Sequence, residues 1–227
     1  MARLAAISPH LGDAVLSCGG TLARHVAQGY EVVLVTVCSG GDALAPRRAA
    51  DQAAADALDC LGAVHLGLEP AELRGYVDLA AFHGLREDDE APAVARGVLA
   101  VALARLAPDL VLAPIGLGGH VDQELTNRAL DALGLPRLRW VDLPYALGRT
   151  AGAPLGAGEP VVVPIAEQLD AKLAAAEHYD RGIGPRLAAY ASAEGERLGA
   201  DGPVELLLSP PAQGAGGGLT LGDATRP

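Results

Sequence analysis

Short runs of apolar residues alternate along the chain with longer segments whose apolar positions recur at helical spacing. The runs are rich in Val, Leu and Ile and are continuous, as in strands that are buried on both faces of a parallel sheet. Such runs occupy residues 4–7, 31–37, 64–68, 109–113 and 161–165, and the helical segments occupy residues 14–28, 47–61, 92–106 and 166–179. Alternating strands and helices with short links predict a three-layer α/β fold around a mostly parallel sheet.

The length and the terminal composition predict one domain with a tail. A chain of 227 residues fits a single hydrophobic core. We expect the domain to span residues 1–208, and we expect residues 209–227, which are rich in Gly, Pro and Ala, to be disordered. Within the domain, Gly62 is predicted to end the second helix. The acidic residues 86–91 are predicted to cap and solvate the helix that follows them.

Charge and cysteine content narrow the classes of partner and the compartment. The formal net charge of −11 argues against nucleic acid and anionic membranes, because both require clustered Lys and Arg. No apolar run approaches the length of about 20 residues that spans a membrane, and the first residues are too few for a signal peptide. The three cysteines, Cys18, Cys38 and Cys60, form no CxxC pair and are expected to stay reduced. We therefore expect a cytoplasmic protein.

Two segments that contain His and Asp directly follow predicted strands. One comes after the first strand and contains His10 and Asp13, and the other comes after the strand at residues 109–113 and contains His120 and Asp122. Ligands of open parallel sheets bind outside the carboxyl ends of the strands, where both segments lie. We therefore expect the four side chains to converge on one site.

These segments resemble the signatures of the LmbE-like, or PIG-L-type, N-deacetylase family. Residues 8–20 are similar to a Pro-His-Leu-Asp-Asp-Ala-Val-Leu-Ser-Cys-Gly variant of the first signature, and residues 120–123 are similar to the family's His-Val-Asp-His segment. Further similarities occur in order at residues 47–51, 66–74, 142–145, 172–179 and 195–197. The resemblance implies a Rossmann-like fold, zinc-dependent removal of acyl groups from amines on sugars or sugar-like metabolites, and a small polar metabolite as partner.

The resemblance also implies roles for individual residues. His10 and Asp13 match two zinc ligands of the family. His120 matches the histidine that stabilises the oxyanion, and Asp122 matches the acid that orients this histidine. These four residues are the candidate catalytic groups.

Two departures from the family pattern alter the expected chemistry. Gln123 stands at the position of the third zinc ligand, and an amide oxygen is a poor match for Zn²⁺, so zinc is expected to be weakly held or absent and no other cofactor is implied. Gly12 stands at the position of the general base, whose assistance is worth about 10² to 10⁴ in rate. Neither Asp122 nor Glu124 is expected to replace the lost groups, because neighbouring side chains point in different directions.

Five further residues are candidates for substrate binding by the same resemblance: Arg48, Asp51, Arg74, Tyr145 and His178. The alternative for Arg48, Asp51 and Arg74 is a salt bridge on a helix surface. The alternative for Tyr145 and His178 is a satisfied core position. The remaining histidines, His25, His65 and His83, match no motif of the family and are expected to have no catalytic role.

Three functions remain open at this stage. The first is an enzyme of specialised metabolism that acts on a small polar metabolite through the remaining His and Asp groups of a remodelled zinc centre. Its reaction could be a metal-free elimination, cyclisation or isomerisation with His120 and Asp122 as acid and base. The second is a conventional zinc-dependent N-deacetylase of an N-acylated amino sugar or similar amine. The third is a catalytically inert protein that binds a metabolite or a partner protein.

Overall fold

The centre of the fold is one twisted sheet, seen in a computed structural model that describes residues 1–82, 84–148, 155–156 and 158–210. Within these residues, seven strands form the sheet in the order β3-β2-β1-β4-β5-β7-β6. The strands are β1 (Arg3–Ser8), β2 (Glu31–Thr36), β3 (Gly62–His65), β4 (Leu110–Pro114), β5 (Leu138–Trp140), β6 (Pro160–Pro164) and β7 (Val204–Leu208). Neighbours from β3 to β5 are parallel, and β7 is antiparallel to β5 and β6. The predicted mostly parallel α/β fold is confirmed.

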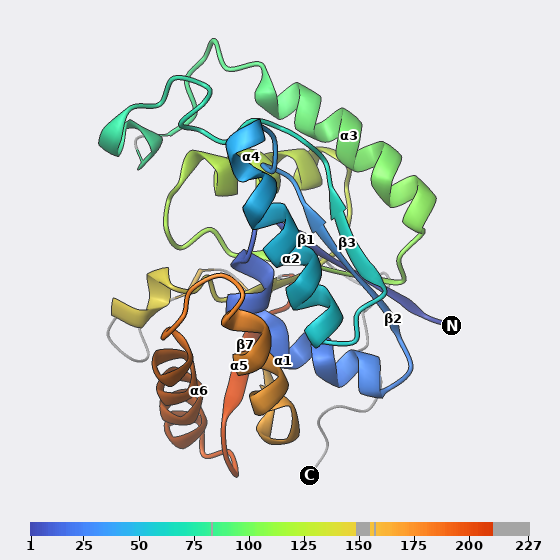
Figure 1. The fold of residues 1–227 in the computed structure, drawn as a ribbon, viewed down its shortest axis with the longest axis vertical. Coiled ribbons are helices and arrows are strands. Elements are labelled where there is room, and N and C mark those ends of the chain that lie inside the picture. Colours follow the sequence, from blue (N-terminus) through green and yellow to red (C-terminus); the bar gives the residue numbers. More distant parts are fainter. Residues whose placement is uncertain (83, 149–154, 157, 211–227) are drawn as a thin grey trace.

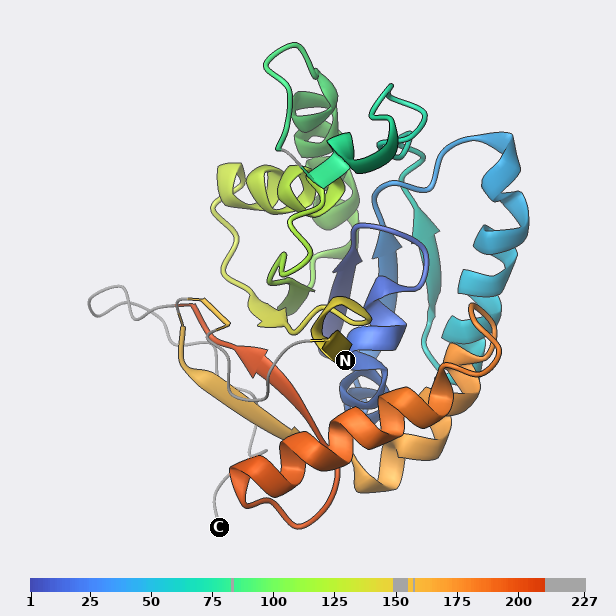
Figure 2. The same cartoon turned by 90° about the vertical axis from the view of Figure 1, so that its left-hand side faces the viewer.

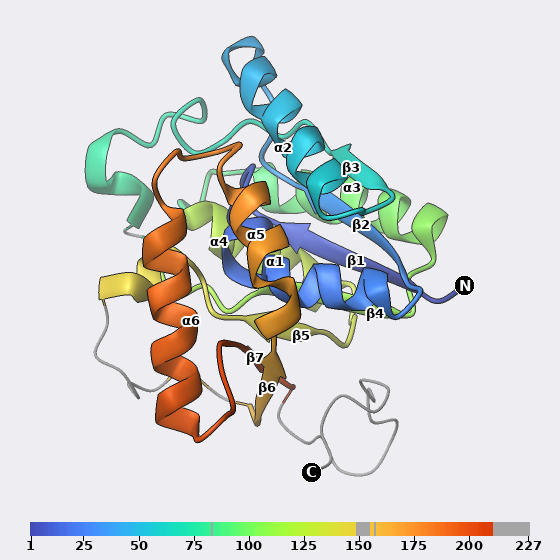
Figure 3. The same cartoon turned by 60° about the horizontal axis from the view of Figure 1, so that its bottom comes forward.

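Helices cover both faces of the sheet (Figures 1 and 2). They are α1 (Asp13–Ala27), α2 (Ala45–Ala57), α3 (Ala91–Leu106), α4 (Val121–Ala132), α5 (Leu169–Ala176) and α6 (Gly184–Leu198). In β1, Leu4 and Ala6 pack on the side of α1, α2 and α5, whereas Ala5 and Ile7 pack on the side of α3 and α4. All four are fully buried, which explains the uninterrupted apolar run. Figure 3 shows α6 beside α5 and β7.

Several element boundaries differ from the prediction. α2 ends at Ala57, and Gly62 begins β3 instead of ending the helix, so β3 is earlier and shorter than predicted. Four elements, α4, α6, β5 and β7, were not predicted from the sequence. The predicted tail lies, from residue 211 onward, outside the described residues, as does His83. None of the described helices is long and apolar enough to cross a membrane.

The acidic segment before α3 has a role beyond solvation. The predicted cap is made by one residue of the segment: Oδ1 of Asp89 accepts a hydrogen bond from the backbone N–H of Ala91, the first residue of α3, at 3.0 Å, whereas the N-cap residue Glu90 makes no side-chain capping bond. The Oδ2 atom of Asp89 accepts hydrogen bonds from Arg74 and from the hydroxyl of Tyr76. Asp89 therefore also fixes the segment between β3 and α3, which lies over the carboxyl edge of the sheet (Figure 2).

A buried carboxylate holds a break in α1. Cys18 has non-helical backbone angles, so the helix restarts after it. Glu205 of β7 accepts hydrogen bonds there from the N–H groups of Gly20 (3.0 Å) and Thr21 (2.7 Å) and from the Thr21 hydroxyl (2.6 Å). Lys172 of α5 lies 2.7 Å from the same carboxylate and neutralises it. Three elements that are distant in sequence are thereby joined at one buried ion pair.

This arrangement predicts unequal effects of two matched substitutions in the core. Thr21→Val is expected to lower the free energy of unfolding by about 2 kcal/mol, because it removes a buried hydrogen bond to a charged group. Thr126 is the control, since it is also fully buried but its hydroxyl donates to the Asp122 carbonyl within α4. Thr126→Val is expected to cost about 1 kcal/mol or less. Urea unfolding measures both, and equal losses would contradict the capping role of Glu205.

Candidate active site

The two His-containing loops meet at the edge of the sheet where the strand order reverses. His10 follows β1 and His120 follows β4, and these two strands are neighbours in the sheet. The ring centroids of His10 and His120 are 4.9 Å apart, with an angle of 79° between the planes. In open α/β sheets, such a switch point is the usual position of a ligand site. The predicted convergence of the two segments is therefore confirmed.

His10 lies between two carboxylates. Its Nδ1 is 3.1 Å from Oδ2 of Asp13, and its Nε2 is 2.9 Å from Oδ2 of Asp122. Burial lowers the pKa of His10, but the charges of Asp13 and Asp122 and their hydrogen bonds outweigh it and raise the pKa to about 10. A neutral ring carries one N–H and can satisfy only one of the two carboxylates. The geometry therefore requires a second proton on the ring or a metal cation between Nδ1 and Asp13.

Asp122 is fully buried, and both of its carboxylate oxygens accept hydrogen bonds. Its Oδ1 accepts a hydrogen bond from Arg74 at 2.8 Å, and its Oδ2 accepts one from the N–H of Ala71 at 2.9 Å in addition to the contact with His10. Burial raises the pKa of Asp122, but the hydrogen bond to His10, the charge of His10, the Ala71 N–H and Arg74 together lower it well below the usual range. Asp122 is thus a permanent anion that orients the ring of His10.

The predicted pair of Asp122 and His120 is not formed by the two side chains. Nδ1 of His120 lies 3.9 Å from the nearest oxygen of Asp122, which is too far for a hydrogen bond. Instead, His120 is the N-cap of α4, and its Nδ1 accepts the backbone N–H of Asp122 at 3.2 Å. The carboxylate prefers His10 and Arg74 because both offer charge-assisted hydrogen bonds.

The capping contact defines the protonation of His120. Because Nδ1 is an acceptor, the ring proton of the neutral form is on Nε2. Burial and the neighbouring charge of His10 lower the pKa of His120, which favours this neutral form. His120 is therefore arranged as a hydrogen-bond donor through Nε2 and not as a base.

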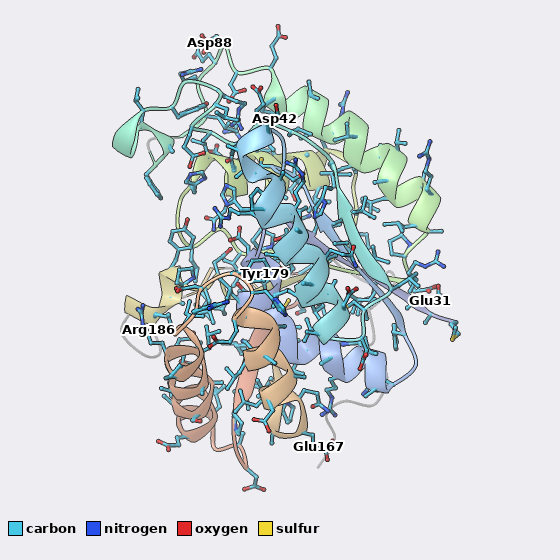
Figure 4. All side chains as sticks on the ribbon, in the orientation of Figure 1. Glu31, Asp42, Asp88, Glu167, Tyr179 and Arg186 are labelled. Carbon is cyan, nitrogen blue, oxygen red and sulfur yellow. The ribbon has the colours of Figure 1, made fainter. Side chains whose placement is uncertain are left out.

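Gly12, where the family resemblance places a general base, lies against an aromatic ring. Gly12 has a φ of 104°, and a Cβ atom added there would lie 3.0 Å from Cδ1 of Tyr179. Tyr179 lies beyond the end of α5, where Figure 4 labels it, and its hydroxyl donates to Oδ1 of Asp51 at 2.6 Å. A side chain at position 12 would meet both backbone strain and the Tyr179 ring.

Gln123 is buried and its amide is held by a carboxylate. The residue is 1% exposed, and its Nε2 donates to Oδ1 of Asp142 at 3.2 Å. The other Asp142 oxygen accepts the N–H groups of Gly116 and Leu117. The Oε1 atom of Gln123 has no hydrogen-bond partner among the described residues. The carboxylate of Asp142 fixes the orientation of the amide, since only the NH₂ group can donate to it.

The candidate substrate-binding residues fall into different groups. Arg74 is ion-paired to Asp122 at the centre, and Arg48 donates to the carbonyls of Ser39 and Gly41 in the loop after β2. Asp51 is 2% exposed and accepts hydrogen bonds from Thr36, His65 and Tyr179, so it supports neighbouring elements. His178 is exposed in the turn after α5.

Tyr145 lies beside the loop that contains His120. Tyr145 begins the short helix η3 (Tyr145–Gly148), and its ring packs on Gly118, two residues before His120. Burial and the charges of Asp13 and Asp142 raise the pKa of Tyr145 to about 12, so its hydroxyl stays protonated at neutral pH.

Two residues of this region, Phe82 and Tyr179, were not among the candidates predicted from the sequence. The ring centroid of Phe82 is 5.1 Å from that of His120, at an angle of 80°. Tyr179 was within a segment of family resemblance, but nothing in the sequence connected it with Gly12. The only available signal for Phe82 was its being the single phenylalanine of the chain.

Comparison with known proteins assigns the chain to a family and supports the fold. The family profile described as PIG-L, GlcNAc-PI de-N-acetylase, matches residues 5–133. This span includes His10, Asp13, His120 and Asp122, and it is more than half of the 227 residues. The chain belongs to the PIG-L family.

Relatives and solved structures have related names. The chain is 32% identical over 167 residues to 2'-N-acetylparomamine deacetylase of Streptomyces fradiae, covering 66% of this chain and 60% of the relative. It is 31% identical over 159 residues to 1D-myo-inositol 2-acetamido-2-deoxy-alpha-D-glucopyranoside deacetylase of Mycobacterium sp. (strain KMS), covering 61% and 51%. The crystal structure of the A40926 pseudoaglycone deacetylase Dbv21 is similar with a TM-score of 0.72 and 27% identity, over 91% of this chain and 96% of that one. The chain thus spans between half and two thirds of the length of these two curated relatives.

Proposed function

We propose that the protein hydrolyses the acetamido group of an N-acetylated amino sugar or a similar polar amine, at a centre altered at positions 12 and 123. The observation that supports this most is the pairing of His10 with Asp13, 3.1 Å apart, next to the neutral donor His120. The two curated relatives are named as deacetylases of acetylated amino sugars. The proposed reaction is that of a conventional N-deacetylase, the second hypothesis from the sequence, and the proposed centre is the remodelled one of the first hypothesis.

The residues present fit a divalent cation held by His10, Asp13 and Gln123. A divalent cation held by His10 and Asp13 would supply the positive charge that their contact requires, and Oε1 of Gln123 is buried with no hydrogen-bond partner in the described part of the chain. Asp122 contacts Nε2 of His10, and Asp142 accepts a hydrogen bond from Nε2 of Gln123. Carboxylates often orient metal ligands through such hydrogen bonds. An amide oxygen is a harder donor than imidazole, so zinc is expected to be held less tightly than by a histidine.

A second possible donor set is less suitable. Ligand atoms of His10, His120 and Asp122 lie within 4.8 Å of one another. However, the Asp122 oxygens already accept hydrogen bonds from Arg74, Ala71 and His10. A cation there would have to displace those donors.

The side chains of the centre can perform the proton transfers of amide hydrolysis. A bound cation supplies polarisation of the acyl carbonyl and a lower pKa for water. Oδ1 of Asp13 accepts no hydrogen bond from a described residue and can take the proton of the attacking water, which Gly12 cannot do. Nε2–H of His120 donates to the carbonyl oxygen as negative charge develops there. The oxygen of this water forms a bond to the acyl carbon, Asp13 passes the proton that it took to the amide nitrogen, and the C–N bond breaks. The products are the free amine and acetic acid, which ionises to acetate.

Metal-free acid–base chemistry by His120 and Asp122 has less structural support. It requires Asp122 to orient His120, whereas the carboxylate of Asp122 is bound to His10 and Arg74. An inert binding protein would give no product at all. An assay of acetate release therefore distinguishes hydrolysis, metal-free chemistry and an inert protein.

The test of this function is acetate release from N-acetylated amino sugars, measured with and without a chelator. We expect release by the wild type that a chelator suppresses and that added divalent metal restores. Asp13→Ala is expected to release no acetate above background. Turnover that persists in the chelated protein would support the metal-free route, and silence across a broad panel of acetylated amines would support the inert protein.

A further inference from the structure

The single phenylalanine of the chain is exposed at the edge of the active site. Phe82 ends the short helix η2 (Asp78–Phe82) and is 44% exposed. Burying a phenylalanine side chain is worth about 1.5 to 3 kcal/mol, so leaving it exposed forgoes much of that stabilisation. The backbone that holds Phe82 is nevertheless well packed, since the preceding Ala81 is 4% exposed.

The ring of Phe82 has a definite position relative to the catalytic groups. Phe82 makes an edge-to-face contact with His120, at a centroid distance of 5.1 Å. His120 makes a similar contact with His10, at a centroid distance of 4.9 Å. Phe82, His120 and His10 thus form a row of three rings. Phe82 is the outer and most exposed member of this row.

The segment around Phe82 is fixed by contacts that do not involve Phe82 itself. Ala71, Tyr76 and Ala81 form a buried cluster with Val121 of α4. Arg74 joins the same segment to Asp122 and Asp89. The ring is therefore presented by a supported backbone, as a preorganised binding surface requires.

We propose that Phe82 is a specificity-determining residue that stacks on the sugar ring of the substrate. One face of a pyranose exposes C–H groups of slight positive charge, which complement the negative face of an aromatic ring. A sugar ring placed there would lie next to His120, the proposed donor to the acyl oxygen. This inference rests on the proposed function for the class of substrate, but binding by Phe82 can be measured without turnover.

The test is a binding titration by saturation-transfer NMR with two probes. Methyl 2-acetamido-2-deoxy-β-glucopyranoside contains the acetamido group on a pyranose ring, and N-acetylethanolamine contains it without a ring. Phe82→Ala is expected to raise the Kd of the pyranoside about tenfold and to leave that of the acyclic amide unchanged. Phe82→Tyr retains a stacking face and is expected to bind the pyranoside within about twofold of the wild type.

Three results would overturn the proposal. The first is no saturation of the pyranoside by the wild type. The second is an unchanged pyranoside Kd in Phe82→Ala. The third is equal weakening of both probes, which would show that Phe82 only supports His120. Failure of the proposed hydrolysis is distinguishable, because absence of acetate release together with Phe82-dependent binding of the pyranoside contradicts the reaction and supports the stacking surface.

Discussion

Replacement of His120 by alanine is expected to lower kcat for acetate release about 10²- to 10³-fold, with a small change in KM. The neutral ring donates through Nε2 because its Nδ1 accepts the Asp122 N–H and because burial and His10 lower its pKa. Such a donor matters most when charge develops on the acyl oxygen, so its loss affects the transition state more than the bound substrate. Steady-state kinetics of acetate release on one acetylated amino sugar measure the effect.

A matched control separates this role from a general disturbance of α4. Arg128→Ala changes an exposed residue of the same helix, whose side chain is 62% exposed and pairs with Glu124. We expect this variant to retain wild-type kinetics. A His120→Ala protein that is folded and keeps more than about half of the wild-type kcat would contradict the assignment of the donor.

Gly12→Asp is expected to destabilise the protein by about 3 kcal/mol instead of restoring a general base. Two physical causes add. The backbone at position 12 has a φ of 104°, which L side chains rarely adopt, and the new Cβ would meet the Tyr179 ring at 3.0 Å. Chemical unfolding measures the loss, and acetate release measures whether the carboxylate assists the reaction.

A double-mutant cycle with Tyr179→Ala tests whether the loss of stability in Gly12→Asp depends on the Tyr179 ring. Removing the ring takes away the steric conflict but not the backbone strain, so the cost of Gly12→Asp should fall by about 1 to 2 kcal/mol in the Tyr179→Ala background. Tyr179→Phe is the control, because it loses the hydrogen bond to Asp51 and keeps the ring. Additive losses in the Tyr179→Ala cycle would contradict the steric match of Gly12 and Tyr179.

The sequence predicts the elements that depend on local patterns. The runs that became β1, β2 and β4 are buried on both faces, and continuous apolar residues are specific to that environment. The meeting of His10 and His120 followed from their places after parallel strands. By contrast, the charged residue Glu205 interrupts the apolar pattern of β7. Its carboxylate can be buried because hydrogen-bond partners from α1 and α5 surround it, and these partners are distant in the sequence.

The pairings inside the site were not predictable from the motifs. Asp122 is only two residues after His120 in sequence, yet its carboxylate binds Arg74, 48 residues earlier, and His10, 112 residues earlier. The choice depends on which charged donors the tertiary fold brings within reach. The contact of Tyr179 with Gly12 likewise joins the end of α5 to the start of α1, and no local signal specifies it.

The most direct test of a hydrolytic centre built on His10, Asp13 and Gln123 is the metal content of the purified protein. Elemental mass spectrometry is applied to the wild type, Asp13→Ala and Gln123→His, each produced with added zinc and purified without chelator. We expect about one divalent ion per chain in the wild type, loss of the ion in Asp13→Ala, and firmer retention against a chelator in Gln123→His. A wild-type protein with no more metal than Asp13→Ala would contradict this expectation.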